Sequence, residues 1–197
     1  MPQELKDGQA TFYAKDASDW RTWLANNTGT EKSIWLIIYR KESDTPSVYY
    51  DEAVDQALCY GWIDSKPNKR DQESFYQFFS KRNPKSNWSR VNKEKVERLI
   101  ANGEMAAPGL EMVALAKKTG TWDALNDVEN GIIPPDLQAA LGQYPKAATH
   151  FEHFPRSVKR GILEWIFNAK KPETRAKRIA ETARLANDNV RANQFRK

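Results

Sequence analysis

The residue types best suited to binding a ligand are concentrated between residues 61 and 92, in the segments GWIDSKPNKRD and FFSKRNPKSNWSRVN. Aromatic side chains alternate there with cations and small hydroxyl groups. Aromatic faces can stack on a ligand, and cations can hold an anionic group. We therefore predict a basic-aromatic site for an anionic small molecule or an acidic protein segment. Its residues would be Trp62, Asp64, Lys66, Arg70, Lys81, Arg82, Lys85, Ser86, Trp88, Ser89 and Asn92.

Three members of this cluster have a specific role in the hypothesis. Ser89 is a good N-cap, and the free N–H groups and positive dipole end of the helix that follows favour an anion. Arg82 could hold that anion through two hydrogen bonds, and Trp88 could stack on it. The same residues also have a purely structural interpretation. Trp62 and Trp88 would then lie in the core, Ser89 would only cap its helix, and the cations would be solvated.

An enzyme would need a proton-transfer group in this cluster, and Asp64 is the candidate. It could act as a base while Arg82 or Lys81 holds an anionic substrate. The cluster lacks His, Cys and a second acid close to Asp64, so we prefer binding without catalysis and keep an enzyme of unassigned reaction as the alternative. The Rossmann glycine pattern, the phosphate loop, HExxH and GxSxG are absent from the sequence. We expect no cofactor.

The remaining metal-ligating and nucleophilic residues favour packing roles. His150 and His153 lie three residues apart and could share a helix face, but Glu152 between them would point away. We therefore predict no metal site. Cys59 lies between Leu58 and Tyr60 on an expected buried helix, where apolar surroundings raise the pKa of a thiol and make it inert.

Positive charge is concentrated toward the C-terminus. The chain carries a net charge of +5, from 31 Lys and Arg against 26 Asp and Glu. Residues 155–197 hold 12 basic and 4 acidic residues, so residues 1–154 are net negative. These basic helices could contact phosphates of a nucleic acid, but Glu164, Glu173 and Glu181 interrupt the cationic face at helical spacing. We expect a solvated face or a patch for an acidic protein partner, and no specific nucleic-acid binding.

The elements that position these residues form an α+β N-terminal part. Apolar spacing predicts helices over residues 16–27 and 51–60. Strands are expected at residues 33–40, 62–64 and 74–80, with a turn at Pro67. Residues 33–40 are apolar on both faces, which is typical of a central strand. Short connections favour a small, mainly antiparallel sheet.

From Ser89 onward the pattern is helical. A helix capped by Ser89 would end before Gly103, and Pro108 would lie in the first turn of the next helix. The polar stretch 119–135 is typical of a linker. Further helices are expected at residues 136–141, 147–154 and 157–169 and from Pro172 onward. We therefore predict an N-terminal domain over residues 1–130 and a helical C-terminal domain over residues 131–197. The inner faces of these helices would include Ile100, Leu110, Ala114, Ala176 and Ala180.

Composition places the chain among globular proteins. Hydrophobic residues make up 40% and charged residues 29%, and no apolar run approaches the roughly 20 residues that a membrane-spanning helix needs. The first residues show no basic segment followed by an apolar one, so no signal peptide is expected. With a single Cys and no export signal, the sequence predicts a soluble, cytoplasmic protein without membrane insertion.

Three long segments resemble a known family: ALCYGWIDSKPNKRD at 57–71, KRNPKSNWSRVNKEKVERLIANGEM at 81–105, and the tail that runs from IPPDLQAALG to ETARL. They are similar to the YdeI/OmpD-associated family, whose members are also labelled bacteriocin-protection proteins. The resemblance covers about residues 10–190. It implies an α+β N-terminal part, a small helical C-terminal domain, and no known reaction or cofactor. The label suggests envelope stress, antimicrobial-peptide resistance or association with an outer-membrane porin.

Overall fold

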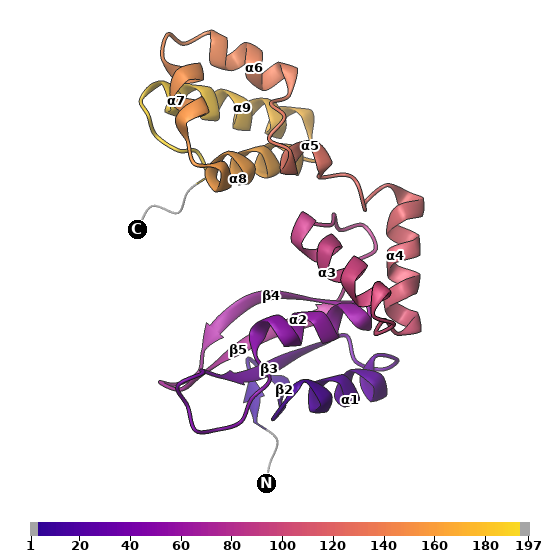
Figure 1. The fold of residues 1–197 in the computed structure, drawn as a ribbon. Helices are drawn as coiled ribbons and strands as arrows, with labels where there is room; N and C mark the ends of the chain where they lie inside the picture. Colours follow the sequence, from indigo (N-terminus) through magenta and orange to yellow (C-terminus); the bar gives the residue numbers. More distant parts are fainter. Residues whose placement is uncertain (1–3, 194–197) are drawn as a thin grey trace. The chain divides into compact units, whose positions relative to one another are not determined.

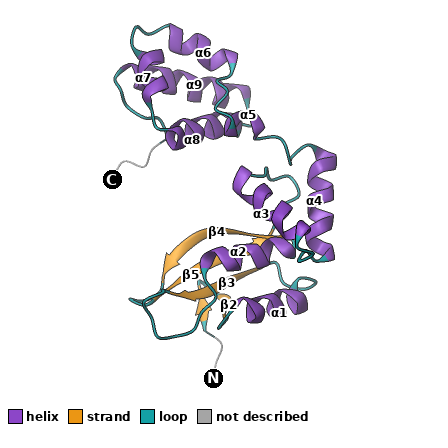
Figure 2. Cartoon of the chain, viewed as in Figure 1, coloured by secondary structure: helices purple, strands orange, loops and turns teal. Residues whose placement is uncertain are grey.

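The computed structural model describes residues 4–193. The chain divides into two compact units, Met1–Asp123 and Ala124–Lys197, each with its own apolar core. Figures 1 and 2 show the described strands in the first unit and only helices in the second. The predicted α+β class with a helical C-terminal part is confirmed.

The first unit is built on one five-stranded sheet. Its strands are β1 (Leu5–Lys6), β2 (Gln9–Tyr13), β3 (Ser33–Tyr39), β4 (Trp62–Lys69) and β5 (Ser74–Lys81), in the spatial order β1-β2-β3-β5-β4. β2 and β3 are parallel, and the other neighbours are antiparallel, so the expectation of a mainly antiparallel sheet is confirmed. β3 is central, as its doubly apolar sequence predicts, and residues 34–38 are all buried.

Helices cover one face of this sheet. α1 (Ala17–Asn27) and α2 (Tyr50–Cys59) lie beside the strands, as Figure 1 shows, and α3 (Arg90–Ala101) and α4 (Ala107–Thr119) pack against α2. Ile34, Leu36 and Ile38 of β3 share a core with apolar residues of these helices. The alternate positions of β3 point to the opposite face, where Trp35 and Ile37 form a separate small cluster.

β4 is longer than predicted, and the turn expected at Pro67 is wrong. The strand continues to Lys69, and the bend follows at residues 71–73. Two features permit a proline inside it. β4 is an edge strand, where a missing N–H need not cost a ladder hydrogen bond. Its register with β5 also shifts between Asp64 and Pro67, which is typical of a bulge.

The second unit is a small helical domain. It contains α5 (Asn126–Glu129), α6 (Pro135–Gly142), α7 (Ala147–His153), α8 (Arg156–Phe167) and α9 (Pro172–Asn187). Leu137, Phe151 and Ile162 lie in its centre and are almost completely buried. The polar stretch 119–135 contains α5, and its Leu125 and Val128 belong to this second core.

Several helix faces differ from the predicted ones. The positions of Ile100, Leu110 and Ala114 were expected to be buried and are exposed. In α9, Ala176 and Ala180 are exposed as well, whereas the buried positions are Ile179, Thr182, Ala183 and Ala186. The core-facing stripe of α9 is therefore rotated away from the predicted one, because helical spacing alone does not say which of two adjacent small-residue rows meets the core.

None of the described helices is long and apolar enough to cross a lipid bilayer.

Candidate functional site

The structure distributes the predicted site residues over both faces of the sheet. Trp62 and Asp64 pair with β5 on the face of Phe79, which belongs to the helix-covered core. Lys66 and Arg70 lie on the opposite face, because the bulge in β4 changes the alternation of its side chains. The Nζ atom of Lys66 is 5.5 Å from the centroid of the Trp35 ring there. These residues therefore do not form a single site.

The side chain of Arg70 has a structural role. Its Nε and Nη2 atoms donate hydrogen bonds to the two carboxylate oxygens of Glu4, at 3.0 and 2.8 Å. Tyr76 also donates a hydrogen bond to Glu4. These hydrogen bonds, with that of Arg70 as the largest effect, hold the pKa of Glu4 below its usual value. Arg70 thus ties the N-terminal segment to the helix-free face.

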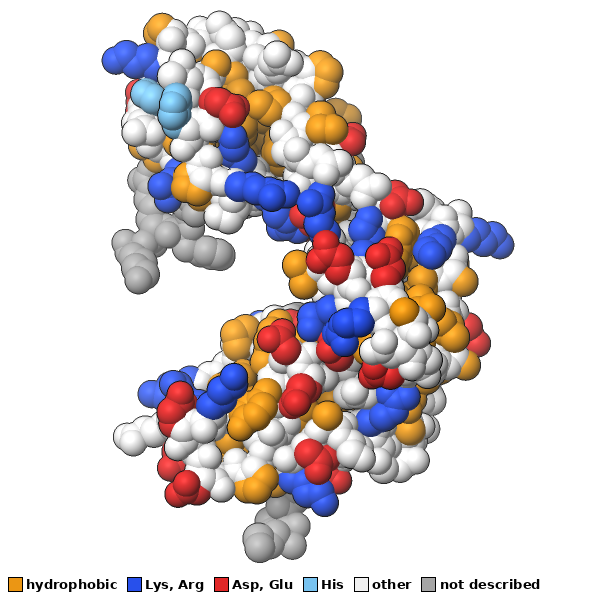
Figure 3. All heavy atoms as spheres, viewed as in Figure 1, with side chains coloured by type: hydrophobic (Ala, Val, Ile, Leu, Met, Phe, Trp, Pro, Cys, Tyr) orange, Lys and Arg blue, Asp and Glu red, His pale blue; other side chains and the backbone are white. Residues whose placement is uncertain are grey.

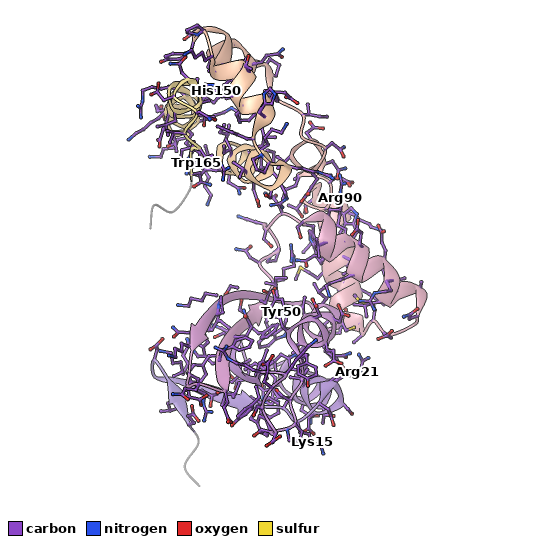
Figure 4. All side chains as sticks on the ribbon, turned by 60° about the vertical axis from the view of Figure 1, so that its left-hand side comes forward. Lys15, Arg21, Tyr50, Arg90, His150 and Trp165 are labelled. Atoms are coloured by element: carbon purple, nitrogen blue, oxygen red, sulfur yellow. The ribbon has the colours of Figure 1, made fainter. Side chains whose placement is uncertain are left out.

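Trp62 and Asp64 are also engaged by neighbours. Trp62 is completely buried, and its indole N–H donates to Thr28 Oγ1 at 2.6 Å. Asp64 accepts a hydrogen bond from the hydroxyl of Tyr50 at 2.7 Å, and Figure 4 labels Tyr50 on the first unit. Burial and the bond to Asp64 raise the pKa of Tyr50. Trp62 is therefore a core residue, as its structural interpretation predicts.

The loop between β5 and α3 uses most of its polar groups internally. The hydroxyl of Ser86 donates to the carbonyl oxygen of Asn83 at 2.7 Å. The hydroxyl of Ser89 accepts from the backbone N–H of Asn92 at 3.3 Å, so its predicted role as N-cap is confirmed. Lys85 is exposed. The loop is thus a folded turn that leads directly into α3.

Arg82 is the unusual residue of this region. It is only 4% exposed, and its guanidinium carbon lies 3.7 Å from the centroid of the Trp88 ring. Nη2 donates to the carbonyl oxygen of Asn87 at 2.5 Å. Among residues 4–193, however, the buried Nε atom has no hydrogen-bond partner and the guanidinium forms no ion pair. Burial lowers the pKa of Arg82 to about 10, and the negative charge of Asp64 opposes this effect.

A pocket of about 500 Å³ opens beside Arg82. Arg82 and Lys81 form one side of it, and Met112 and Leu115 of α4 form an apolar side. Glu111 brings one carboxylate to the α4 wall. The complete lining is Thr28, Tyr60, Gly61, Lys81, Arg82, Pro84, Pro108, Glu111, Met112 and Leu115.

The wall formed by α4 depends on a close approach between two backbones. A Cβ atom at Gly109 would lie 2.3 Å from the carbonyl oxygen of Cys59, so only glycine lets α4 pack this tightly on the end of α2. The neighbouring Gly61 has φ +73°, and its carbonyl oxygen accepts a hydrogen bond from the backbone N–H of Arg82 at 2.9 Å. These contacts place the end of β5 next to α4.

Sequence reasoning found the two cations of this pocket and missed its other walls. Thr28, Met112 and Leu115 come from segments far from residues 61–92, and no local pattern connects them. It also missed Trp122, whose ring centroid is 5.0 Å from that of Trp88. Trp122 lies in the polar stretch that the sequence predicts to be a linker, although a lone tryptophan there is a signal for burial.

Two family models match the chain. Residues 12–112 match the model described as Domain of unknown function (DUF8412). Residues 130–189 match the model described as Bacteriocin-protection, YdeI or OmpD-Associated. The chain is a DUF8412 protein with a YdeI/OmpD-associated domain. The resemblance seen in the sequence is confirmed over its tail. No curated protein and no solved structure matches the chain.

In the YdeI/OmpD-associated domain, the two histidines contact the backbone. His150 Nδ1 is 2.8 Å from the carbonyl oxygen of Ala186, and His153 Nδ1 is 2.7 Å from that of Thr149. Figure 4 labels His150 and Trp165 in this domain. The guanidinium carbon of Arg178 lies 4.9 Å from the centroid of the Trp165 ring.

In the DUF8412 part, the geometry required by the enzyme alternative is not present among the described residues. Asp64 does not line the pocket that contains Lys81 and Arg82, and its carboxylate accepts the Tyr50 hydroxyl instead. Cys59 is fully buried, and burial raises the pKa of its thiol. The arrangement is suited to holding an anion beside a cation, with apolar contact on one side.

Proposed function

We propose that the first unit binds a small organic anion in the pocket beside Arg82, and that the protein acts as a binding protein. The observation that carries this proposal is the burial of the Arg82 guanidinium without an ion pair in the described part of the chain. Removing a cation from water costs several kcal/mol unless an opposite charge compensates it. An anion bound beside Arg82 would supply that charge.

The rest of the lining restricts the ligand. Lys81 adds a second, exposed cation on the side of Arg82, whereas Met112 and Leu115 offer apolar contact on the side of α4. Glu111 would repel a second negative charge near α4. The pocket therefore favours a molecule with one anionic group at the Arg82 end and an apolar body, such as a monocarboxylate or a phosphate monoester with a hydrophobic tail.

A thermal-shift experiment on the full chain tests this proposal. The probes are a panel of monocarboxylates and phosphate monoesters of increasing apolar size, together with inorganic phosphate. A ligand at about 100 times its dissociation constant adds about 2.7 kcal/mol of stability, which a melt detects. Arg82→Met removes the charge and keeps much of the side-chain volume. The matched control is Arg40→Met, which removes an exposed arginine of the same unit outside the pocket.

We expect at least one amphiphilic anion to stabilise the wild type and Arg40→Met and to have no effect on Arg82→Met. If no probe stabilises the wild type more than Arg82→Met, the pocket is not an anion site. Stabilisation by inorganic phosphate alone, without gain from an apolar tail, would contradict the role given to α4.

The description of the C-terminal family supplies a cellular context for this binding. We propose that it serves protection against bacteriocins or envelope stress, from the cytoplasmic location expected from the sequence. Cells that lack the protein should then regain bacteriocin resistance with the wild type and not with Arg82→Met. Equal rescue by the wild type and by Arg82→Met would show that protection does not depend on binding in the pocket.

A further inference from the structure

The side chain of Thr28 adds an uncharged hydroxyl group to the pocket beside Arg82. Thr28 follows the last residue of α1 and lines the same hollow of about 500 Å³ as Lys81 and Arg82. Its backbone N–H donates to the carbonyl oxygen of Leu24 at 2.9 Å, so the end of α1 holds it in place. The proposed function uses the charges of the two cations and gives Thr28 no role.

The hydrogen bond from Trp62 determines how the Thr28 hydroxyl group can be used. The indole N–H of the completely buried Trp62 lies 2.6 Å from Thr28 Oγ1. An indole N–H donates and cannot accept, so Thr28 Oγ1 is the acceptor in this bond. The hydroxyl proton of Thr28 therefore remains available, and it donates to no atom within residues 4–193.

Other threonines of the helices use this proton on their own backbone. The hydroxyl of Thr22, in α1, donates to the carbonyl oxygen of Ser18 at 2.9 Å. That of Thr182, in α9, donates to the carbonyl oxygen of Arg178 at 2.8 Å. Such a bond to the residue four positions earlier is common for threonine in a helix. Thr28 forms no equivalent side-chain bond in the part of the chain that the structure describes.

Strand pairing places Thr28 next to the basic end of the pocket. Trp62, which bonds to Thr28, is the register partner of Lys81 across β4 and β5. Paired side chains lie on the same face of a sheet, with Cβ atoms about 5 Å apart. Arg82 follows Lys81, and its buried Nε atom has no hydrogen-bond partner among residues 4–193. The ammonium of Lys81, the Nε–H of Arg82 and the hydroxyl proton of Thr28 are all donors.

The carbonyl end of α1 is the feature that opposes an anion at this position. The C-terminal end of a helix carries partial negative charge, and no basic residue lies in the last turn of α1. The carbonyl oxygen of Asn27 is occupied there, since it accepts the backbone N–H groups of Thr30 and Glu31 at 3.1 and 2.8 Å. The helix end itself would not attract an anion, so a favourable contact has to come from the Thr28 side chain.

We infer that the hydroxyl of Thr28 donates a hydrogen bond to the anion bound beside Arg82, and that the ligand is an oxyanion offering separate oxygen atoms to Arg82 and Thr28. This inference rests on the proposed function. The apolar body of the ligand would contact α4, where Leu115 is 37% exposed. Figure 3 shows hydrophobic side chains at the surface where Figure 1 places α4. Different residues would thus bind the head and the tail of the ligand.

The test measures the two contributions by isothermal titration calorimetry of the full chain. The probes are hexanoate, octanoate and decanoate and the alkyl phosphates of the same lengths. Thr28→Val removes the hydroxyl and keeps the shape of the side chain, and Thr28→Ser retains the hydroxyl. The matched control is Thr22→Val, which removes an exposed hydroxyl of α1 outside the pocket. Leu115→Ala shortens the apolar side.

Circular dichroism checks that each variant is folded at the temperature of the titration. Thr28→Val leaves the buried N–H of Trp62 without its acceptor, which costs stability. If that variant does not fold, Thr28→Cys replaces it, because a thiol occupies the same place and is only a weak donor and acceptor.

We expect Thr28→Val to weaken binding about tenfold for every chain length, since one hydrogen bond to a charged group is lost. Thr28→Ser and Thr22→Val should bind like the wild type. Leu115→Ala should weaken decanoate more than hexanoate, because only the longer tail reaches the shortened side chain.

Two sets of outcomes distinguish this inference from the proposed function. If Arg82→Met abolishes binding but Thr28→Val binds like the wild type, or Thr28→Ser loses as much affinity as Thr28→Val, the anion site stands and the role of Thr28 is wrong. A loss in Thr28→Val that grows with chain length also overturns that role, since it would come from the shape of the apolar side. If the wild type binds no probe, or Arg82→Met binds equally well, the proposed function fails and the inference with it.

Discussion

The guanidinium group of Arg82 is stacked on the ring of Trp88, with 3.7 Å between the guanidinium carbon and the ring centroid. Trp122 lies beside the same ring, with 5.0 Å between the centroids. Trp88 is only 2% exposed. It therefore presents its face to Arg82, and a ligand in the adjacent pocket would meet the cation. If the proposed anion site exists, the ring would lie behind it, and Trp88 would then be both a core residue and a support for the binding cation.

Truncation of the Trp88 side chain should destabilise the protein. Trp88→Ala removes a buried ring that contacts both Arg82 and Trp122, so we expect the free energy of unfolding to fall by about 3–5 kcal/mol. Urea unfolding followed by tryptophan fluorescence measures it. Tyr49→Ala is the control, because this ring is 40% exposed, and it should cost much less. Equal, small losses in both variants would show that Trp88 is not part of the core.

Arg82→Met should abolish anion binding without lowering the free energy of unfolding. The wild-type cation is buried and forms no ion pair within the described residues, and replacing such a group by an apolar one is often neutral or stabilising. We expect the variant to be as stable as the wild type, or more stable by about 1 kcal/mol, when no ligand is present. Urea unfolding without added anions measures this. A loss of more than about 2 kcal/mol would show instead that Arg82 mainly anchors its loop through the bond to Asn87.

The parts of the fold that local sequence determines were predicted well. β3 is central because its side chains are apolar on both faces, α3 begins after the Ser89 cap, and α9 begins at Pro172. β4 was predicted too short because Pro67 indicates a turn in most contexts. Only the position of β4 at the sheet edge, which depends on the whole topology, makes a proline acceptable there.

The candidate site was predicted only in part, for a similar reason. Lys81 and Arg82 were identified from their own segment, but Thr28 and Met112 reach the same pocket through the packing of α1 and α4. Nothing in the spacing of residues 61–92 could predict that Lys66 would lie on the other face of the sheet, because this depends on a bulge. Contacts between distant segments are the information that a single sequence lacks.

Two glycine substitutions should change stability in opposite directions. Gly109→Ala would place a methyl group 2.3 Å from a backbone oxygen, and we expect a loss of about 1–3 kcal/mol in the first unit. Gly161 lies within α8 and has no atom within 4 Å of its ideal Cβ position. Gly161→Ala should therefore stabilise the second unit by about 0.5–1 kcal/mol.

The readouts for these variants follow from where the aromatic residues lie. Trp165 is in the second unit, and the other tryptophans are in the first. Tryptophan fluorescence thus reports mainly on Gly109→Ala, whereas amide hydrogen exchange of α8 reports on Gly161→Ala. A stable Gly109→Ala protein would mean that α4 does not approach α2 as closely as described.

The ion pair between Asp136 and Arg175 should make the stability of the second unit depend on pH. The hydrogen bonds from Arg175 hold the pKa of Asp136 below its ordinary value of 3.8. Because the folded pKa is the lower one, this stabilisation is fully present above about pH 4 and is lost as the pH falls through the folded value. Both side chains are partly exposed, 31% for Arg175 and 47% for Asp136. The ion pair therefore contributes about 0.5–1 kcal/mol to the free energy of unfolding.

Asp136→Asn measures this contribution directly. At neutral pH the variant should be less stable than the wild type by that amount, and the difference should shrink at acidic pH as the carboxyl group becomes protonated in the folded as well as the unfolded state. Asp127→Asn is the control for the loss of one carboxylate in this unit, since Asp127 forms no ion pair among the described residues. If the loss in Asp136→Asn were the same at both pH values, it would come from the start of α6, where Asp136 accepts the backbone N–H of Leu137 at 2.9 Å, and not from the charge of the pair.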